Sequence, residues 1–179
     1  MLKRAMAVRE ITKFPDPVLR RKTEPVAAID GTLERLIDDM IETMHAAPGV
    51  GLAANQVGVP LQLAVIDLTS SEERKKGVRQ PILVIINPEI LSMEGSVVEE
   101  EGCLSIPDYA ETVKRAARVK VRAQDRTGKS FELEAEGLMA KALQHEIDHL
   151  NGILFVDRLS TLKKSIFKRK YKKTVLEKA

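Results

Sequence analysis

Residues 138–150 read LMAKALQHEIDHL, and their pattern predicts a helix. Asn151-Gly152 follows this run, and such a pair is typical of the left-handed cap that ends a helix. His145 and His149 are four residues apart, so a helix places both on one side, one turn from each other. Two imidazoles at this spacing can bind one metal ion, with Glu146 beside it. The alternative is an ordinary helix with two surface histidines.

A second helix is predicted before it, over residues 31–45. Asp30 is placed to cap its first turn, and the residues after it are apolar at helical spacing. These apolar residues are Leu33, Leu36, Ile37, Met40, Ile41 and Met44. Residues 48–58 are rich in glycine and small side chains, which indicates a shaped loop.

The middle of the chain is predicted to form strands. Residues 118–123 and 131–135 alternate between apolar and polar side chains, and turn residues at 125–129 join them into a β-hairpin. Further extended runs are expected at 62–68, 82–86 and 90–103, with a polar loop at 69–80. Strands grouped between an early and a late helix predict an α+β fold, with antiparallel sheets around the metal-binding helix and a helix at each end of the chain.

The last residues differ from the rest in charge. Residues 160–179 contain eight Lys and Arg against one acid, whereas the whole chain has a formal net charge of +3. We expect residues 1–160 to form the catalytic domain and 161–179 a basic helical tail of the same domain, with Leu162, Ile166 and Arg169 on one side. A tail of this charge suits an anionic partner such as RNA. A solvated helix is the alternative.

Composition is that of an ordinary globular protein. Of the 179 residues, 44% are hydrophobic, but only 3% are aromatic and none is Trp, so aliphatic side chains and Met must build the core. The longest apolar runs are too short to cross a bilayer, and the first residues do not resemble a secretory signal. A single cysteine, Cys103, excludes an internal disulfide and agrees with a reducing compartment. We therefore expect a cytoplasmic location and no membrane or DNA partner.

The histidine helix needs a further ligand, because a catalytic divalent ion usually has three protein ligands and one open position. No histidine follows His149, and the later carboxylates, Asp157 and Glu177, are poorly placed. Cys103 follows Gly102 in the sequence EGCLS. A lone cysteine is by default a small buried apolar residue. Together with the two histidines, however, it gives the simplest complete catalytic set.

Three separated motifs resemble those of bacterial-type peptide deformylases. They are GVGLAANQ at 49–56, EGCLS at 101–105 and QHEIDH at 144–149, in the order and spacing of that family. The resemblance covers nearly the whole chain. It implies a metal-dependent hydrolase that removes the formyl group from the N-terminal formyl-methionine of nascent polypeptides and releases formate.

The resemblance also implies roles for individual residues. Cys103, His145 and His149 would bind the metal, typically Fe²⁺, with Zn²⁺, Ni²⁺ or Co²⁺ able to replace it. Thiolate and imidazole are compatible with all of these ions.

Glu146 would act as general base and then as general acid. The Gln56 side-chain amide and the Leu104 backbone N–H would stabilise the oxyanion of the tetrahedral intermediate.

An apolar pocket should bind the methionine side chain. Leu138 and Ala142 lie seven and three positions before His145, on the ligand side of the helix, and Val50 and Gly51 come from the glycine-rich loop. Ordinary core packing is the alternative for Leu138. Lys141 shares that side and is expected at the pocket rim.

Asp148 lies between the two histidines in sequence, and a carboxylate on a buried helix needs a partner. Arg115 is the candidate for this partner. A solvated surface acid is the alternative.

Two other classes of function compete with deformylation. A zincin-like metallopeptidase would use the same histidine pair to cut internal peptide bonds. A non-enzymatic ribosome-binding module would use the basic tail, either alone or as a catalytically silent deformylase relative.

Overall fold

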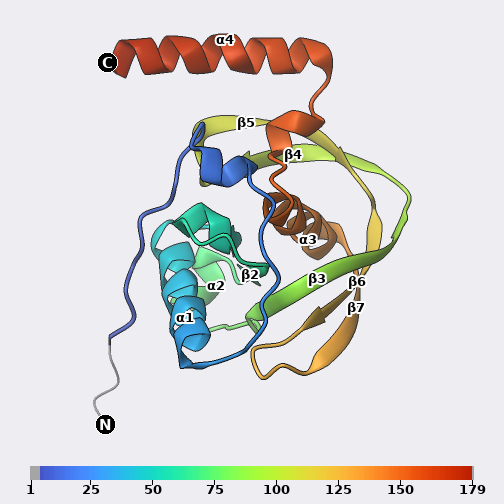
Figure 1. Cartoon of the computed structure of the whole chain (residues 1–179). Coiled ribbons are helices and arrows are strands. Elements are labelled where there is room, and N and C mark those ends of the chain that lie inside the picture. The colour runs from blue at the N-terminus through green and yellow to red at the C-terminus, as the bar shows by residue number, and fades with distance from the viewer. Residues whose placement is uncertain (1–4, 179) are drawn as a thin grey trace.

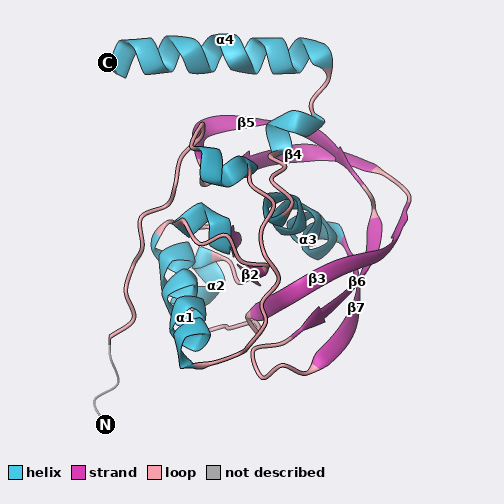
Figure 2. Cartoon of the chain, viewed as in Figure 1, coloured by secondary structure: helices cyan, strands magenta, loops and turns pink. Residues whose placement is uncertain are grey.

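The structure is a computed structural model that describes residues 5–178. Within that range, a five-stranded and a two-stranded antiparallel sheet surround helix α3 (Gly137–Leu150), as Figures 1 and 2 show. The other helices are α1 (Gly31–Ala46), α2 (Ser71–Lys75) and α4 (Thr161–Lys178). This arrangement confirms the predicted α+β class and the central place of the histidine helix.

The larger sheet has the strand order β1-β2-β3-β6-β7, and each neighbouring pair is antiparallel. Its strands are β1 (Gly51–Ala53), β2 (Leu63–Ile66), β3 (Leu83–Glu94), β6 (Arg118–Gln124) and β7 (Ser130–Glu136). β6 and β7 form the hairpin that the sequence predicts, with Val121 opposite Leu133.

The smaller sheet is the hairpin of β4 (Val97–Cys103) and β5 (Ile106–Arg115). Its register shifts between Gly102 and Cys103, next to the tight connection into β5. The predicted extended run over 90–103 is thus divided between β3 and β4 by a turn at Gly95, which has a positive φ of 65°. No strand is predicted over β5, in which Asp108 has a positive φ of 63°.

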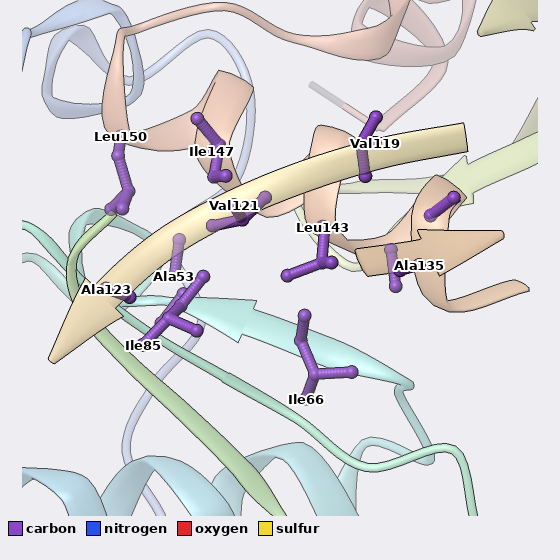
Figure 3. Packing of buried hydrophobic residues seen from close by; sticks show 13 residues of the cluster. Ala53, Ile66, Ile85, Val119, Val121, Ala123, Ala135, Leu143, Ile147 and Leu150 are labelled. Atoms are coloured by element: carbon purple, nitrogen blue, oxygen red, sulfur yellow. The ribbon is translucent and has the colours of Figure 1, made fainter. Parts of the chain in front are cut away.

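Two apolar layers enclose the short strand β2. Its residues alternate, so that Ala64 and Ile66 pack with α3 while Leu63 and Val65 pack with α1. Figure 3 shows the first layer, in which Leu143 and Ile147 of α3 meet side chains of the larger sheet. α3 is therefore fixed between sheet and hairpin.

The helix ends follow the expected chemistry. The Asp30 carboxylate accepts a hydrogen bond from the Leu33 N–H at 2.9 Å, which confirms the predicted cap of α1. Gly152, just after α3, has a φ of 73°, as the Asn-Gly pair indicates.

Two predicted loops contain regular structure. Residues 48–58 include β1, in which Leu52 lies opposite Val65, and the 3-10 helix η2 (Ala54–Val57). Residues 69–80 include α2, which a capping box of Ser70 and Glu73 begins. The Ser-x-x-Glu signal for this cap is present in the sequence, but five residues are too short to show an apolar period.

The C-terminal helix forms as predicted, and aromatic side chains make its main contact with the rest of the protein. Leu162 is 71% exposed, whereas Phe167 is buried and Tyr171 is half-buried. These two rings join Phe14, Tyr109 and Phe155 in an aromatic cluster. Within residues 5–178, no helix is both long and apolar enough to span a bilayer.

Candidate metal centre

Three side chains that could bind a metal ion meet where β4 ends against α3. The Cys103 Sγ lies 3.3 Å from the His149 Nε2, and the Nε2 atoms of His149 and His145 are 3.1 Å apart. All three donor atoms lie within 4.8 Å of one another. The tip of the β4–β5 hairpin therefore brings Cys103 to the histidine pair across 42 residues of sequence.

The donor set fits a single divalent cation. Zn–N bonds of about 2.0–2.1 Å place two nitrogens of a tetrahedral site roughly 3.3 Å apart, close to the observed separation. Burial lowers the pKa of His149 well below its usual value, which favours the neutral imidazole that a metal requires. Two of the donors, Cys103 and His145, line a groove of about 770 Å³, and His149 lies buried behind them. A fourth position toward this groove would be open to water or substrate.

Glu146 lies in the same groove and is almost fully buried. Its Oε2 has no hydrogen-bond partner among the described residues, which is unusual for a buried carboxylate. Burial raises the pKa of Glu146 to about 7. A carboxylate with a pKa near neutrality can both accept and donate a proton at physiological pH, although a bound cation would oppose part of that rise.

Gly51 of β1 forms the wall against Glu146. A Cβ atom at position 51 would lie 2.4 Å from the Glu146 Oε1 and 2.8 Å from its Cδ. The glycine thus allows the carboxylate to approach the backbone of the glycine-rich segment.

Gln56 of η2 aims its amide at the same place. Its Oε1 accepts the Ala53 N–H at 2.9 Å, and its Nε2 donates to the Ser105 Oγ at 3.0 Å and lies 3.6 Å from the Cys103 Sγ. The bond to Ala53 orients the amide, so that the N–H₂ group faces the donor set. Leu104 lines the groove next to it.

A buried carboxylate behind the site holds one of the histidines. Glu101 accepts from the His145 Nδ1 at 2.8 Å, which leaves the His145 Nε2 for a metal. Burial alone would raise the pKa of Glu101, but hydrogen bonds from Arg115 and His145 lower it to about 2. Glu101 is therefore ionised at all physiological pH values.

The structure places Arg115 beside Asp148, with Nη1 and Oδ2 2.5 Å apart. The other face of the Arg115 guanidinium donates to Glu101 in a bidentate pair at 2.8 and 2.9 Å. Arg158 donates to both oxygens of Asp148, at 2.6 and 2.7 Å. Four charges thus form one network behind the histidines.

Sequence reasoning missed Glu101 and Arg158 as parts of this network. The sequence could have indicated Glu101, because this residue lies two positions before Cys103 in the EGCLS motif. No sequence pattern indicated Arg158, because it lies on the short 3-10 helix η3 (Phe155–Arg158), whose residues show no periodicity.

The four residues proposed for the methionine pocket, Val50, Gly51, Leu138 and Ala142, all line the groove. Val50 and Leu138 are 41% and 48% exposed, so neither is an ordinary core residue. Lys141 is at the rim, where its ammonium donates to the Glu100 carbonyl at 3.1 Å and lies 3.4 Å from the Glu99 carboxylate.

Comparison with known proteins agrees with this geometry. Residues 8–165 match the model of the polypeptide deformylase family. A peptide deformylase of Thermodesulfovibrio yellowstonii is 52% identical over 167 residues, which cover 93% of this chain and 98% of that protein. The crystal structure of a peptide deformylase from Legionella pneumophila superimposes with a TM-score of 0.85 at 49% identity, covering 96% of this chain and 98% of that one.

A further crystal structure, of an Acinetobacter baumannii class I type b peptide deformylase with bound Met-Ala-Ser, matches with a TM-score of 0.79 at 35% identity. The match covers 87% of this chain and 100% of that one. Matches of this extent and identity, together with the metal site, show that the chain belongs to the polypeptide deformylase family.

Proposed function

We propose that Cys103, His145 and His149 bind one divalent ion and that Glu146 moves the protons in the hydrolysis of an N-formyl group. As a member of its family, the chain is a hydrolase that removes the formyl group from nascent polypeptides and releases formate. The observation that carries the assignment is the position of Glu146, a buried carboxylate without a hydrogen-bond partner among the described residues, beside a thiol and two imidazoles.

The ion is a divalent cation, and we propose Fe²⁺ as the native one, with Zn²⁺, Ni²⁺ or Co²⁺ as substitutes. Such an ion supplies Lewis-acid activation of water at neutral pH. Cys103 contributes the soft thiolate ligand, and Glu101 keeps the His145 ring oriented toward the ion.

Proton transfer falls to Glu146. It takes a proton from the attacking water and passes it to the amine that leaves when the formyl C–N bond breaks. The burial of Glu146 and its raised pKa support both proton transfers, the uptake from water and the delivery to the amine. Gly51 lets the carboxylate lie next to the reacting atoms.

Gln56 and Leu104 are proposed to stabilise the oxyanion. The Gln56 Nε2 is already directed at the donor set by the Ala53 hydrogen bond, and the Leu104 backbone belongs to the same hairpin tip as Cys103. Donors fixed before the reaction lose little energy in reorganisation.

The substrate is proposed to be a polypeptide that begins with formyl-methionine. Val50, Gly51, Leu138 and Ala142 would enclose the methionine side chain. The Acinetobacter baumannii relative with bound Met-Ala-Ser supports a site of this kind. Lys141 at the rim would meet the peptide backbone or its next side chain.

The test is formate release from formyl-Met-Ala-Ser by protein purified without oxygen and loaded with iron or nickel. We expect turnover that Glu146→Ala abolishes while the bound metal, measured by elemental analysis, stays. A casein digest checks for cleavage of internal peptide bonds, which a zincin-like peptidase would produce. Absence of formate from metal-loaded native protein would overturn the proposal.

We further propose a cytoplasmic location, where formyl-methionyl chains are made, and a contact between α4 and the ribosome. The exposed lysines of α4 favour an anionic partner, and this helix belongs to the same folded unit as the proposed catalytic domain 1–160. Cosedimentation of the protein with ribosomes at low and high salt tests the contact. Cosedimentation that survives removal of residues 161–179 would contradict it.

A further inference from the structure

A second groove lies next to the catalytic one, under α4. It has a volume of about 590 Å³ and runs between α4 and the start of β5. Figure 1 shows α4 crossing the top of the molecule above β5, with its C-terminal end projecting beyond the body. The α4 wall of this groove includes Lys170, Tyr171, Lys173 and Thr174.

The two grooves share part of their walls. Six residues line both of them: Lys13, Ile106, Pro107, Asp108, Tyr109 and Ala110. The two grooves therefore adjoin each other along this wall. The shared wall also begins three residues after Cys103, so it is close to the donor set along the chain.

The proposed substrate needs such an exit. A nascent polypeptide has its formyl group at the metal-binding atoms and its methionine side chain near Leu138 and Ala142, and the rest of the chain must leave the catalytic groove. An extended chain advances about 3.3 Å per residue, so residues soon after the methionine reach beyond the first groove. The wall shared with the second groove offers a continuous surface for them.

The floor of the second groove is aromatic. Tyr109 and Phe167 have ring centroids 4.8 Å apart, and Tyr171 meets Phe14 edge-on at 4.8 Å. The Tyr171 hydroxyl donates to the Phe14 carbonyl at 3.0 Å, which fixes the ring. Rings held in this way offer apolar contact without losing side-chain freedom when a peptide binds.

The α4 wall is basic. Lys170, Lys173 and Lys178 line it, against one acid, Glu177, which is 3.8 Å from the Lys173 ammonium. On the opposite wall, Glu111 pairs with Lys163 at 2.9 Å, and the formal charges of Lys13 and Asp108 offset each other. Acidic side chains on a bound peptide would thus meet a positive surface.

From this continuity and charge, and resting on the deformylase function proposed above, we propose that the groove under α4 binds the nascent polypeptide downstream of its first three residues and favours acidic side chains there. The second groove would then act as a specificity surface for longer substrates. Tripeptides would not reach it.

The experiment compares formyl-Met-Ala-Ser with three extended peptides on the metal-loaded protein. Each begins with formyl-Met-Ala-Ser and continues for five residues that include two Asp, two Lys or two Ser. At low salt we expect the kcat/KM for the Asp peptide, relative to the tripeptide, to exceed that for the Lys peptide about threefold to tenfold, as two exposed ion pairs allow. The difference should lie in KM, because the contact is made equally in ground and transition states.

Two double variants of α4 distinguish the groove from the general charge of the helix. Lys170→Glu with Lys173→Glu reverses two charges in the groove wall, whereas Lys168→Glu with Lys172→Glu makes the same charge change at exposed positions outside it. We expect the preference for the Asp peptide to vanish or reverse in the first variant and to persist in the second. Equal loss in both would show a general anion surface, such as one for RNA, and would overturn the proposal, as would equal kcat/KM for all extended peptides.

Fluorescence anisotropy of labelled, unformylated versions of the peptides measures groove binding without catalysis. Tighter binding of the Asp peptide, lost only in the Lys170→Glu and Lys173→Glu variant, would support the groove even if no formate were released. Failure of the tripeptide reaction would count against the deformylase function alone. Equal anisotropy curves for the Asp and Lys peptides would count against the groove alone.

Discussion

Glu146 is positioned by the shape of its surroundings more than by hydrogen bonds. Its Oε2 has no partner within the described part of the chain, and the carboxylate lies against the backbone of Gly51. A side chain held by steric contact has little freedom to adjust when one wall moves. Small changes in that wall should therefore affect proton transfer directly.

Gly51→Ala should disable the enzyme while leaving its metal in place. The new Cβ would meet the Glu146 Oε1 at 2.4 Å and push the carboxylate away from the reacting atoms. A misplacement of about 1 Å can cost roughly 100-fold in rate, and we expect kcat for formyl-Met-Ala-Ser to fall by about that factor. Elemental analysis should show an unchanged metal content.

Gly31→Ala is the matched control, since its Cβ would have its nearest neighbour, Arg35, at 3.4 Å. It should keep native kcat. Native kcat in Gly51→Ala would show that Glu146 tolerates displacement, and that its position is not critical.

Gln56→Ala tests the proposed oxyanion donor. Loss of one such donor raises the barrier by about 2.7–4 kcal/mol, so kcat should fall by about 100-fold to 1,000-fold. Gln56 makes its other hydrogen bonds to Ala53 and Ser105 and is not one of the three metal-binding donors, so the ion should stay bound. Steady-state kinetics measure the kcat of Gln56→Ala, and elemental analysis measures its bound metal. A near-native kcat would show that Gln56 does not stabilise the oxyanion.

Single residues in the motifs were predictable because their chemistry is local. Two histidines four apart on a helix lie close enough to bind one ion through the geometry of the helix alone. Glu101 and Arg158 were not predictable in this way, because their partners come from other elements. Glu101 meets His145 across 44 positions, and Arg158 reaches Asp148 only through the turn after α3.

At the scale of elements, Arg115 joins three parts of the fold. It lies on β5 and pairs with Glu101 on β4 and Asp148 on α3, and all three side chains are at least nine-tenths buried. Burial alone would lower the pKa of Arg115, but its hydrogen bonds to Glu101 raise the pKa, so the guanidinium is always charged. The hairpin and the helix are thus held together behind the donor set by one cation.

Arg115→Met should destabilise the protein and loosen the metal site. Two carboxylates would stay buried without their common partner, at a cost of about 3–5 kcal/mol in the free energy of unfolding. Metal affinity should fall by about 10-fold to 100-fold, because Glu101 would no longer be held against His145. Urea unfolding and competition with a metal chelator measure the two effects.

Arg118→Met is the control for this change. Arg118 also faces two acids, Glu94 and Glu136, but its side chain is 59% exposed. Its loss should change the free energy of unfolding by about 1 kcal/mol or less. If the free energy of unfolding fell equally in both variants, burial of the Arg115 ion pairs would not explain their contribution to stability.

The elements that sequence predicted best are those with a clear period. α1 and the β6–β7 hairpin each have one exposed and one buried side, and both were placed within a residue or two of their observed ends. β1, α2 and β5 were missed or taken as loop. β1 and α2 are short, and the pairing partners of β1 and β5 decide their structure more than their own residues do.

At the scale of the whole molecule, the candidate metal site lies where elements from separate parts of the sequence meet. α3 brings two donors and Glu146, the β4–β5 hairpin brings Cys103, and the segment before β2 brings Gly51 and Gln56. No single segment contains a working site. The sequence could therefore show which residues take part through its motifs, but the distances between them follow from the tertiary packing of sheet, hairpin and helix.

The aromatic cluster under α4 gives the whole chain its C-terminal anchor. Five of the six Phe and Tyr residues belong to it, on four separate segments: Phe14, Tyr109, Phe155, Phe167 and Tyr171. The Phe155 ring also stacks 6.4 Å from the His145 ring, so the cluster reaches the donor set. α4 is therefore a structural part of the protein as well as a charged surface.

Removal of residues 161–179 should lower the melting temperature, whereas removal of 172–179 should not. The longer truncation takes away Phe167, which is 5% exposed, and Tyr171 with its hydrogen bond to Phe14. Loss of a buried Phe costs about 3–5 kcal/mol, and 1 kcal/mol corresponds to roughly 2–4 °C for a chain of this size. We expect the metal-loaded protein to melt about 6–20 °C lower, by circular dichroism.

The shorter truncation keeps both rings and removes lysines of the tail, and the residues it removes whose side chains the structure describes are all exposed. It therefore tests loss of charge without loss of aromatic packing. Below its melting transition the longer truncation should still release formate from formyl-Met-Ala-Ser, because every proposed catalytic residue lies before position 150. Equal melting temperatures for the two truncated proteins would mean that α4 is not anchored by Phe167. A normal melting temperature with no formate release would instead place a catalytic requirement in the tail.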